Sequence, residues 1–220
     1  MLLDALGTLI ELEPPWPHLV AAMAARGVAI TEESARAAMV AEMAYYRAHH
    51  DEAGTRAGLA DLRRRCAEIV AGALASPLAV DEVQAALLEA LRFRPYPEAV
   101  AVLDALRRRG ATLVVVSNWD LSLHDVLGAT GLDRRVDHVV TSAELGVAKP
   151  DPAIFAHALA LAGVGADQAL HVGDSIKADV AGARAAGIEV ILLARAGERA
   201  PTGTRAIASL EQLLDEAPKG

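Results

Sequence analysis

Strand-like and helix-like segments alternate along the chain after Pro97, and this alternation is the strongest constraint on the fold. The expected elements, in chain order, are a helix over 98–109, a strand over 112–117, a helix over 121–129, a strand over 136–141, a helix over 152–162, a strand over 168–172, a helix over 176–186, a strand over 189–193 and a helix near 209–216. Such strands are joined by right-handed crossovers and form a parallel sheet with helices on both faces. We therefore predict an α/β core of the Rossmann-like, doubly wound type.

The region between the first strand, expected over 2–6, and Pro97 has a different pattern. From Glu13 onward, apolar residues recur at intervals of three and four with charged residues between them, which indicates amphipathic helices. Four helices are predicted here. The first follows Pro15, the second follows the N-cap residue Thr31, the third covers about 59–74 and the fourth covers about 80–91. We predict a discontinuous core of residues 1–12 and 97–220 that is interrupted by an all-helical cap of residues 13–96. Prolines at the end of this insertion mark a hinge, so it can act as a lid.

Composition narrows the class of protein. The net charge is −8 and the isoelectric point is about 5.4, which argues against a nucleic-acid or anionic membrane surface. Cys66 is the single cysteine, so the chain suits a reducing compartment, and its apolar runs stay below the ~20 residues of a membrane span. No basic-then-apolar leader opens the sequence. We expect a cytoplasmic protein with a small-molecule partner; the oligomeric state does not follow from the sequence.

Polar residues stand where four of the expected elements end or begin. Asp4 ends the first strand, Ser117-Asn118 end the second, Lys149 precedes the helix start at Asp151-Pro152, and Asp174 follows the strand over 168–172. The carboxyl ends of parallel strands converge at one edge of the sheet. Two carboxylates, a lysine, a hydroxyl and an amide at that edge predict a site for a divalent cation and an anionic, oxygen-rich group.

These residues, in this order, resemble the motifs of the haloacid dehalogenase-like hydrolase superfamily, and the resemblance covers essentially the whole chain. The motifs are Asp4-x-x-Gly7-Thr8, Ser117-Asn118, Lys149-Pro150 and Gly173-Asp174-Ser175-x-x-x-Asp179. The resemblance implies that Asp4 is a nucleophile that forms an aspartyl intermediate and also binds Mg²⁺. It implies that the backbone carbonyl of Leu6 and the side chain of Asp174 complete the protein's ligands, and that Asp179 supports this loop and Lys149. Ser117, with Asn118 and Lys149, would hold a phosphoryl oxygen.

The sequence departs from that family's phosphatases at Leu6, where an acid–base aspartate is usual. Leucine cannot exchange protons, so about 10²–10⁴-fold of general acid–base assistance would have to come from another group. Three hypotheses stay open. The favoured one is a Mg²⁺-dependent phosphatase of a small phosphorylated metabolite, the second is a dehalogenase of short 2-halo acids, and the third is a catalytically weak, ligand-binding or regulatory protein.

Two observations separate the alternatives. The superfamily also includes phosphonatases, which use a lysine of the cap as a Schiff base. That activity is excluded because Lys149, Lys177 and Lys219 are the only lysines and none lies in the helical insertion. Asp174 weakens the dehalogenase hypothesis, since its charge would repel a substrate carboxylate.

The cap and the second strand end offer further candidate residues for the crevice. The candidates for reaching a substrate from the cap are Tyr45, Tyr46, Arg47 and Arg56, and the candidates for the crevice wall are Trp119 and Asp120. We interpret His171 as a core histidine and the run His49–Glu52 as a solvated helix end.

Overall fold

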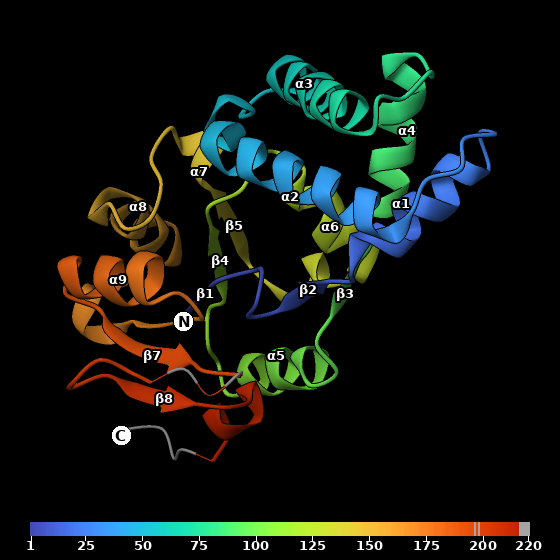
Figure 1. Cartoon of the computed structure of the whole chain (residues 1–220). Helices are drawn as coiled ribbons and strands as arrows, with labels where there is room; N and C mark the ends of the chain where they lie inside the picture. Colours follow the sequence, from blue (N-terminus) through green and yellow to red (C-terminus); the bar gives the residue numbers. More distant parts are fainter. Residues whose placement is uncertain (196, 198, 216–220) are drawn as a thin grey trace.

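A parallel sheet forms the centre of the molecule, as predicted (Figure 1). The computed structural model describes residues 1–195, 197 and 199–215. The strands lie in the order β5-β4-β1-β6-β7-β8, and every neighbouring pair is parallel. Their bounds are β1 Leu2–Leu3, β4 Val114–Ser117, β5 His138–Thr141, β6 Leu170–Gly173, β7 Glu189–Leu193 and β8 Arg205–Ile207.

Alternate strand residues build two apolar layers, because successive side chains of a strand point to opposite faces. Leu3 and Val115 belong to the layer that packs on α5 (Ala99–Arg108) and α6 (Leu123–Thr130). Leu2 and Val114 belong to the other layer, which packs on α8 (Pro152–Ala162) and α9 (Ala181–Ala185). Both faces are therefore buried, which explains why the strands read as continuous apolar runs.

A block of four helices lies over one end of the sheet, and we call it the helical block (Figure 1). Its helices are α1 Pro15–Ala24, α2 Glu32–His49, α3 Arg56–Leu74 and α4 Val80–Ala90. They share an apolar cluster of their own, which supports our proposed division between a core and an inserted cap. Thr31 caps α2 by accepting a hydrogen bond from the Ser34 amide, as the sequence predicts. Across the described residues, no helix is both long and apolar enough to span a lipid bilayer.

The connection between block and core is a small antiparallel sheet rather than a simple hinge. β2 (Ile10–Leu12) pairs with β3 (Phe93–Pro95), so the helical prediction for the insertion is wrong at its end. The chain segments that leave and re-enter the core run side by side, and their backbone groups form hydrogen bonds with each other. The Tyr96 amide, for example, donates to the Leu9 carbonyl at 3.0 Å.

Other boundaries also differ from the sequence prediction. The third helix begins at Arg56 because Thr55 caps it, and the first strand covers only Leu2–Leu3. The segment 176–186 is a π-helix, Ile176–Val180, followed by α9. A short helix α7 (Ser142–Leu145) and the strand β8 were not predicted. The last helix is a 3₁₀ turn over Leu210–Leu213, and residue 216 of its predicted range lies outside the described residues.

The helical block touches the core through the loop after α2. The Ser142 hydroxyl donates to Asp51 at 2.5 Å, and the Leu121 amide donates to the Ala53 carbonyl at 3.1 Å. A Cβ on Gly54 would lie 2.1 Å from the Ala143 carbonyl oxygen, so the two backbones meet directly there. The segment expected to be a solvated helix end is thus partly a contact between the two parts.

We predict that Gly54→Ala lowers the free energy of unfolding by about 1–3 kcal/mol, because the added methyl group has no space beside the rigid Ala143 backbone. Gly72→Ala is the matched control, since a Cβ there meets nothing within 4 Å and alanine favours a helix. Urea unfolding measures both variants. Equal stability of Gly54→Ala and the wild type would show that the two backbones are not in close contact.

Candidate active site

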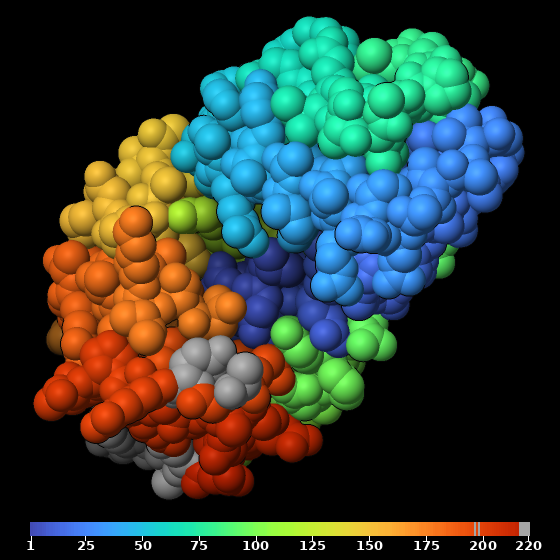
Figure 2. Space-filling model, viewed as in Figure 1, coloured from blue at the N-terminus to red at the C-terminus, as the bar shows by residue number. Residues whose placement is uncertain are grey.

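Adjacent strand ends bring the predicted polar residues together. β4, β1 and β6 are neighbours in the sheet, so Ser117, Asp4 and Asp174 emerge at the same edge. The Asp4 amide donates to the Val172 carbonyl at 2.9 Å, which fixes the backbone at the end of β1 to β6. Figure 2 shows the N-terminal segment, in dark blue, recessed between the helical block and the C-terminal part of the core.

Lys149 joins two carboxylates at the centre of the site. Its Nζ lies 2.6 Å from Asp4 Oδ1 and 2.6 Å from Asp179 Oδ1. The Ser117 hydroxyl also donates to Asp4 Oδ1, at 3.1 Å. The lysine is 5% exposed, Asp4 6% and Asp179 1%. Because burial removes water from all three charges, each depends on the others for compensation.

The two carboxylates differ in their ease of ionisation. Burial raises the pKa of Asp4 to about 6, despite the nearby Lys149. Burial also opposes ionisation of Asp179, but Lys149 and His171 outweigh it and lower the pKa of that carboxyl. Burial acts against the charge of Lys149, yet Asp179 and Asp4 raise its pKa. The lysine is therefore charged, and additional positive charge near Asp4 would favour its ionised form.

Asp179 is held by several donors. Besides Lys149, the His171 Nε2 lies 2.9 Å from Asp179 Oδ1, and the Ser175 amide donates to Oδ2 at 3.0 Å. A Cβ on Gly173 would lie 2.2 Å from Asp179 Cγ, so glycine is required for this approach. His171 is fully buried, as expected for a core histidine, and it also orients this carboxylate.

The carboxylates fit a hard divalent cation. Asp4, Asp174 and Asp179 each offer an oxygen within 4.8 Å of the others. Because both oxygens of Asp179 already accept hydrogen bonds, Asp4 and Asp174 are the better candidate ligands. Gly7, with φ of 82°, leaves room for Asp174, whose Oδ2 would lie 2.2 Å from a Cβ at that position. The Leu6 side chain is 41% exposed beside the site.

Asn118 positions the Lys149 backbone. Its Oδ1 accepts from the Lys149 amide at 2.7 Å, and its Nδ2 donates to the Lys149 carbonyl at 2.8 Å. Both side-chain polar atoms of Asn118 thus fix the loop that delivers the lysine. Asp151 caps α8 by accepting from the Ala153 amide, as predicted.

A cavity of about 760 Å³ extends from these residues to the underside of the helical block. Its lining includes Asp4, Leu6, Gly7, Ser117, Asn118, Trp119, Asp120, Lys149, Asp174, Ser175 and Asp179 from the core. Tyr46 and Arg47 line it from α2, as expected, whereas Tyr45 and Arg56 are not among its lining residues. Trp119 both lines the cavity and packs on Phe93, with ring centroids 5.2 Å apart.

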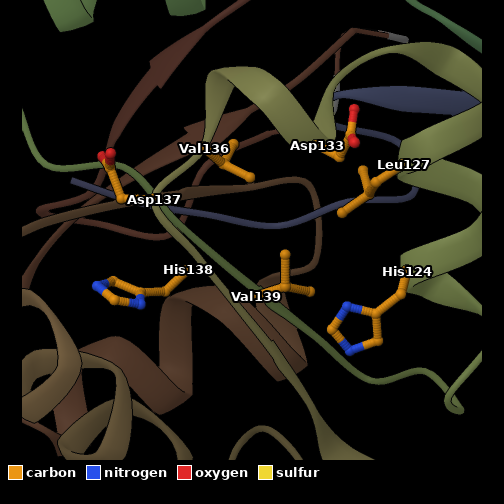
Figure 3. A pocket seen from close by; sticks show the side chains of 7 residues that line it. All are labelled: His124, Leu127, Asp133, Val136, Asp137, His138 and Val139. Carbon is orange, nitrogen blue, oxygen red and sulfur yellow. The ribbon is translucent and has the colours of Figure 1, made fainter.

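A second hollow of about 350 Å³ lies between α6 and β5 (Figure 3). Its lining residues are His124, Leu127, Asp133, Val136, Asp137, His138 and Val139. The polar side chains are spread around it and do not converge on one point (Figure 3). None of the predicted site residues lines this hollow.

Arg195 is a site-supporting residue that the sequence did not indicate. Its guanidinium donates to the Gly7 carbonyl at 3.2 Å and to the Thr8 carbonyl at 2.9 Å, forms an ion pair with Glu98 at 2.6 Å and stacks on Tyr96 at 3.5 Å. It therefore joins the turn after Asp4 to the chain that returns from the helical block. Backbone carbonyls carry no residue signature, so no sequence pattern could have revealed this contact.

The fold is a doubly wound α/β core with a buried aspartate at the carboxyl edge of its parallel sheet. The chain belongs to the haloacid dehalogenase-like hydrolase family, whose model matches residues 1–187.

Partial matches link the chain to named relatives. It is 47% identical over 96 residues to haloacid dehalogenase-like hydrolase domain-containing protein 3 of Bos taurus, 41% over 109 residues to a phosphoserine phosphatase of Thermus thermophilus, and 41% over 121 residues to a phosphoglycolate phosphatase of Cupriavidus necator. These matches cover 44%, 49% and 54% of this chain and 38%, 43% and 51% of the relatives. The chain thus spans about half, or less, of the length of the relatives it matches.

Solved structures match over almost the whole chain. The magnesium-bound putative HAD-hydrolase YfnB of Bacillus subtilis has a TM-score of 0.72 at 17% identity, with 97% of this chain and 96% of that chain covered. An L-2-haloacid dehalogenase of Xanthobacter autotrophicus has a TM-score of 0.66 at 20% identity, with 96% and 95% covered. At these identities the similarity establishes the fold alone.

We predict that Lys149→Met lowers the free energy of unfolding by about 3–5 kcal/mol, because it leaves two buried carboxylates without their cation. Urea denaturation followed by circular dichroism measures the change. Lys177→Met is the control, since Lys177 is exposed and its replacement should alter stability by less than about 0.5 kcal/mol. Similar losses in the two variants would contradict the buried ion-pair network.

Proposed function

We propose that this hydrolase is a Mg²⁺-dependent phosphatase of small phosphorylated metabolites, with Asp4 as the nucleophile. The observation that carries the proposal is the retained pair of carboxylates, Asp4 and Asp174, close together beside the charged Lys149. This combination suits a phosphoryl group, whose oxygens need positive charge on several sides. The partial matches to two proteins named as phosphatases are consistent with it.

In the proposed mechanism, an Asp4 oxygen attacks phosphorus and the bond to the ester or anhydride oxygen breaks, leaving an aspartyl phosphate. Water then attacks that phosphorus and releases inorganic phosphate. Asp4, Asp174 and the Leu6 backbone carbonyl would hold Mg²⁺, which, when bound, supplies positive charge to the phosphoryl oxygens. Lys149 and Ser117 would donate hydrogen bonds to these oxygens and hold the nucleophile in place.

Leu6 sets the expected range of leaving groups. Its side chain is partly exposed to the cavity and offers no proton to a departing alkoxide. Acyl phosphates and aryl phosphates release oxygen anions of low pKa and need little help of that kind. We therefore propose that this enzyme prefers such substrates over simple alkyl phosphates.

Hydrolysis of a short 2-halo acid is the second candidate function, and Leu6 is the observation that favours it. A halide leaves without a proton, so this chemistry needs no acid at residue 6. Asp174 weighs against it, because its negative charge lies within 4.8 Å of an Asp4 oxygen, where a substrate carboxylate would be repelled.

We expect the wild type to release phosphate from acetyl phosphate and p-nitrophenyl phosphate in Mg²⁺, and EDTA to abolish this activity. Asp4→Asn should reduce the rate by about 10³-fold or more, because amide oxygen is a poor nucleophile. Asp81→Asn, an exposed change at the start of α4, is the control and should leave the rate unaltered. EDTA-resistant halide release from 2-chloropropionate would favour the dehalogenase instead. Binding without turnover of either class would favour the weakly catalytic alternative.

We predict that Leu6→Asp raises turnover of alkyl phosphates by about 10²–10⁴-fold, since it restores a group that can protonate the leaving oxygen. Turnover of acetyl phosphate should change much less. Leu6→Asn is the matched control, because asparagine has the shape of aspartate without its proton exchange. Steady-state kinetics on both substrates test this. An equal response of the Asp and Asn variants would contradict a missing proton donor as the limiting factor.

A further inference from the structure

The cavity continues beyond Asp4 into the helical block, where most of its wall is apolar. Met43, Leu62, Leu87, Leu88 and Leu91 line this deep part from α2, α3 and the end of α4. Leu62 and Leu87 are almost fully buried, whereas Leu88 is 37% exposed. A wall of this kind favours a leaving group with an apolar body.

Two buried carboxyl groups interrupt this wall. Glu42 of α2 is 4% exposed and Asp120, in the loop after β4, is 3% exposed; both line the cavity. Glu42 hydrogen-bonds the Cys66 thiol, a weak donor, and Asp120 accepts from the Ser122 amide at 2.6 Å. Neither carboxyl forms an ion pair within the described part of the chain. Buried carboxyl groups are ordinarily paired with a cation. Glu42 and Asp120 are buried without such a partner in the described part of the chain.

Tyr46, one turn after Glu42 on α2, adds a third oxygen to this region. Its buried hydroxyl has no hydrogen-bond partner of good geometry among the described residues. Burial and the nearby Asp120 and Glu42 raise the pKa of that hydroxyl, which places all three oxygen groups close together. Because the hydroxyl also interacts with Asp120, it can accept a hydrogen bond from a ligand while it donates to that carboxylate.

Arginine side chains do not neutralise these groups. Arg47 and Arg63 also line the cavity, but neither forms an ion pair with Glu42 or Asp120 in the described structure. Arg47 is exposed, so its charge is solvated. The region around Glu42 therefore remains rich in acceptors and poor in positive charge.

We propose that Glu42, with Asp120 and the Tyr46 hydroxyl, forms a subsite for a primary ammonium group on the leaving group of the substrate. The inference rests on the proposed phosphatase function and specifies its substrate class: an aryl phosphate whose phenol carries an amine at the end of an apolar body. The ammonium supplies the cation that the two carboxyls lack and donates to three acceptors. The competing explanation is a neutral Glu42 that only hydrogen-bonds Cys66 inside the helical block.

Matched aryl phosphates test the subsite. The probes are 4-(aminomethyl)-, 4-(2-aminoethyl)- and 4-(3-aminopropyl)phenyl phosphate, each compared with the alkyl isostere in which methyl replaces ammonium. We expect the wild type to prefer at least one amine over its isostere by about 10- to 100-fold in kcat/KM, as expected for a hydrogen bond to a charged group. Glu42→Gln should remove most of this preference, because it lowers kcat/KM for the amine far more than for the isostere. Glu33→Gln, an exposed change on the same helix, should behave as the wild type.

Binding to the Asp4→Asn variant separates the two proposals, because calorimetric titration needs no turnover. There the amine probe should bind about tenfold or more tightly than its isostere, and adding Glu42→Gln should abolish the difference. If the amine binds more tightly than its isostere but the wild type releases phosphate from none of the probes, the proposed function is wrong and the subsite stands. Phosphate release from all probes with no amine preference, or equal effects of Glu42→Gln on amine and isostere, would overturn the subsite.

Discussion

The buried ion pairs of Lys149 with Asp4 and Asp179 are the interaction on which the site depends. A lysine with 5% exposure retains its charge only because carboxylates lie on two sides of it, 2.6 Å away in each case. Those carboxylates come from residues 145 and 30 positions distant in the chain. The two ion pairs therefore connect the end of β1, the loop before α8 and the π-helix after β6. Asn118 holds the lysine backbone and so adds the end of β4.

The same turn that carries Asp4 also connects the core to the helical block. Arg195 binds the carbonyls of Gly7 and Thr8, while its ion pair with Glu98 and its stacking on Tyr96 reach the returning chain. β2 and β3 pair between these two segments. A displacement of the helical block would consequently act on the backbone next to Asp4, the proposed nucleophile. The cavity between the two parts combines groups suited to phosphate at one end with apolar and acidic groups at the other.

Much of this arrangement could be predicted from the sequence, because local patterns carried it. Apolar runs marked the strands, Thr31 and Asp151 marked helix starts, and polar residues at strand ends marked the edge where the site lies. β3 could not be predicted because Phe93–Pro95 becomes a strand only through its pairing with β2. Arg195 binds backbone carbonyls 187 and 188 residues away, a contact with no local signature. No sequence pattern distinguishes Glu42 from an ordinary solvated helix position, and only the packing of α2 places it at the cavity.

The central claim is that Asp4 and Asp174 share one divalent cation beside the charged Lys149. A crystal structure of the protein with Mn²⁺, read from its anomalous scattering, tests this most directly, because manganese accepts the same oxygen ligands as magnesium. The account predicts one strong anomalous peak bonded to carboxylate oxygens of both aspartates, with Lys149 still contacting Asp4 and Asp179. An absent peak at saturating Mn²⁺, or a metal bound without either aspartate, would contradict it.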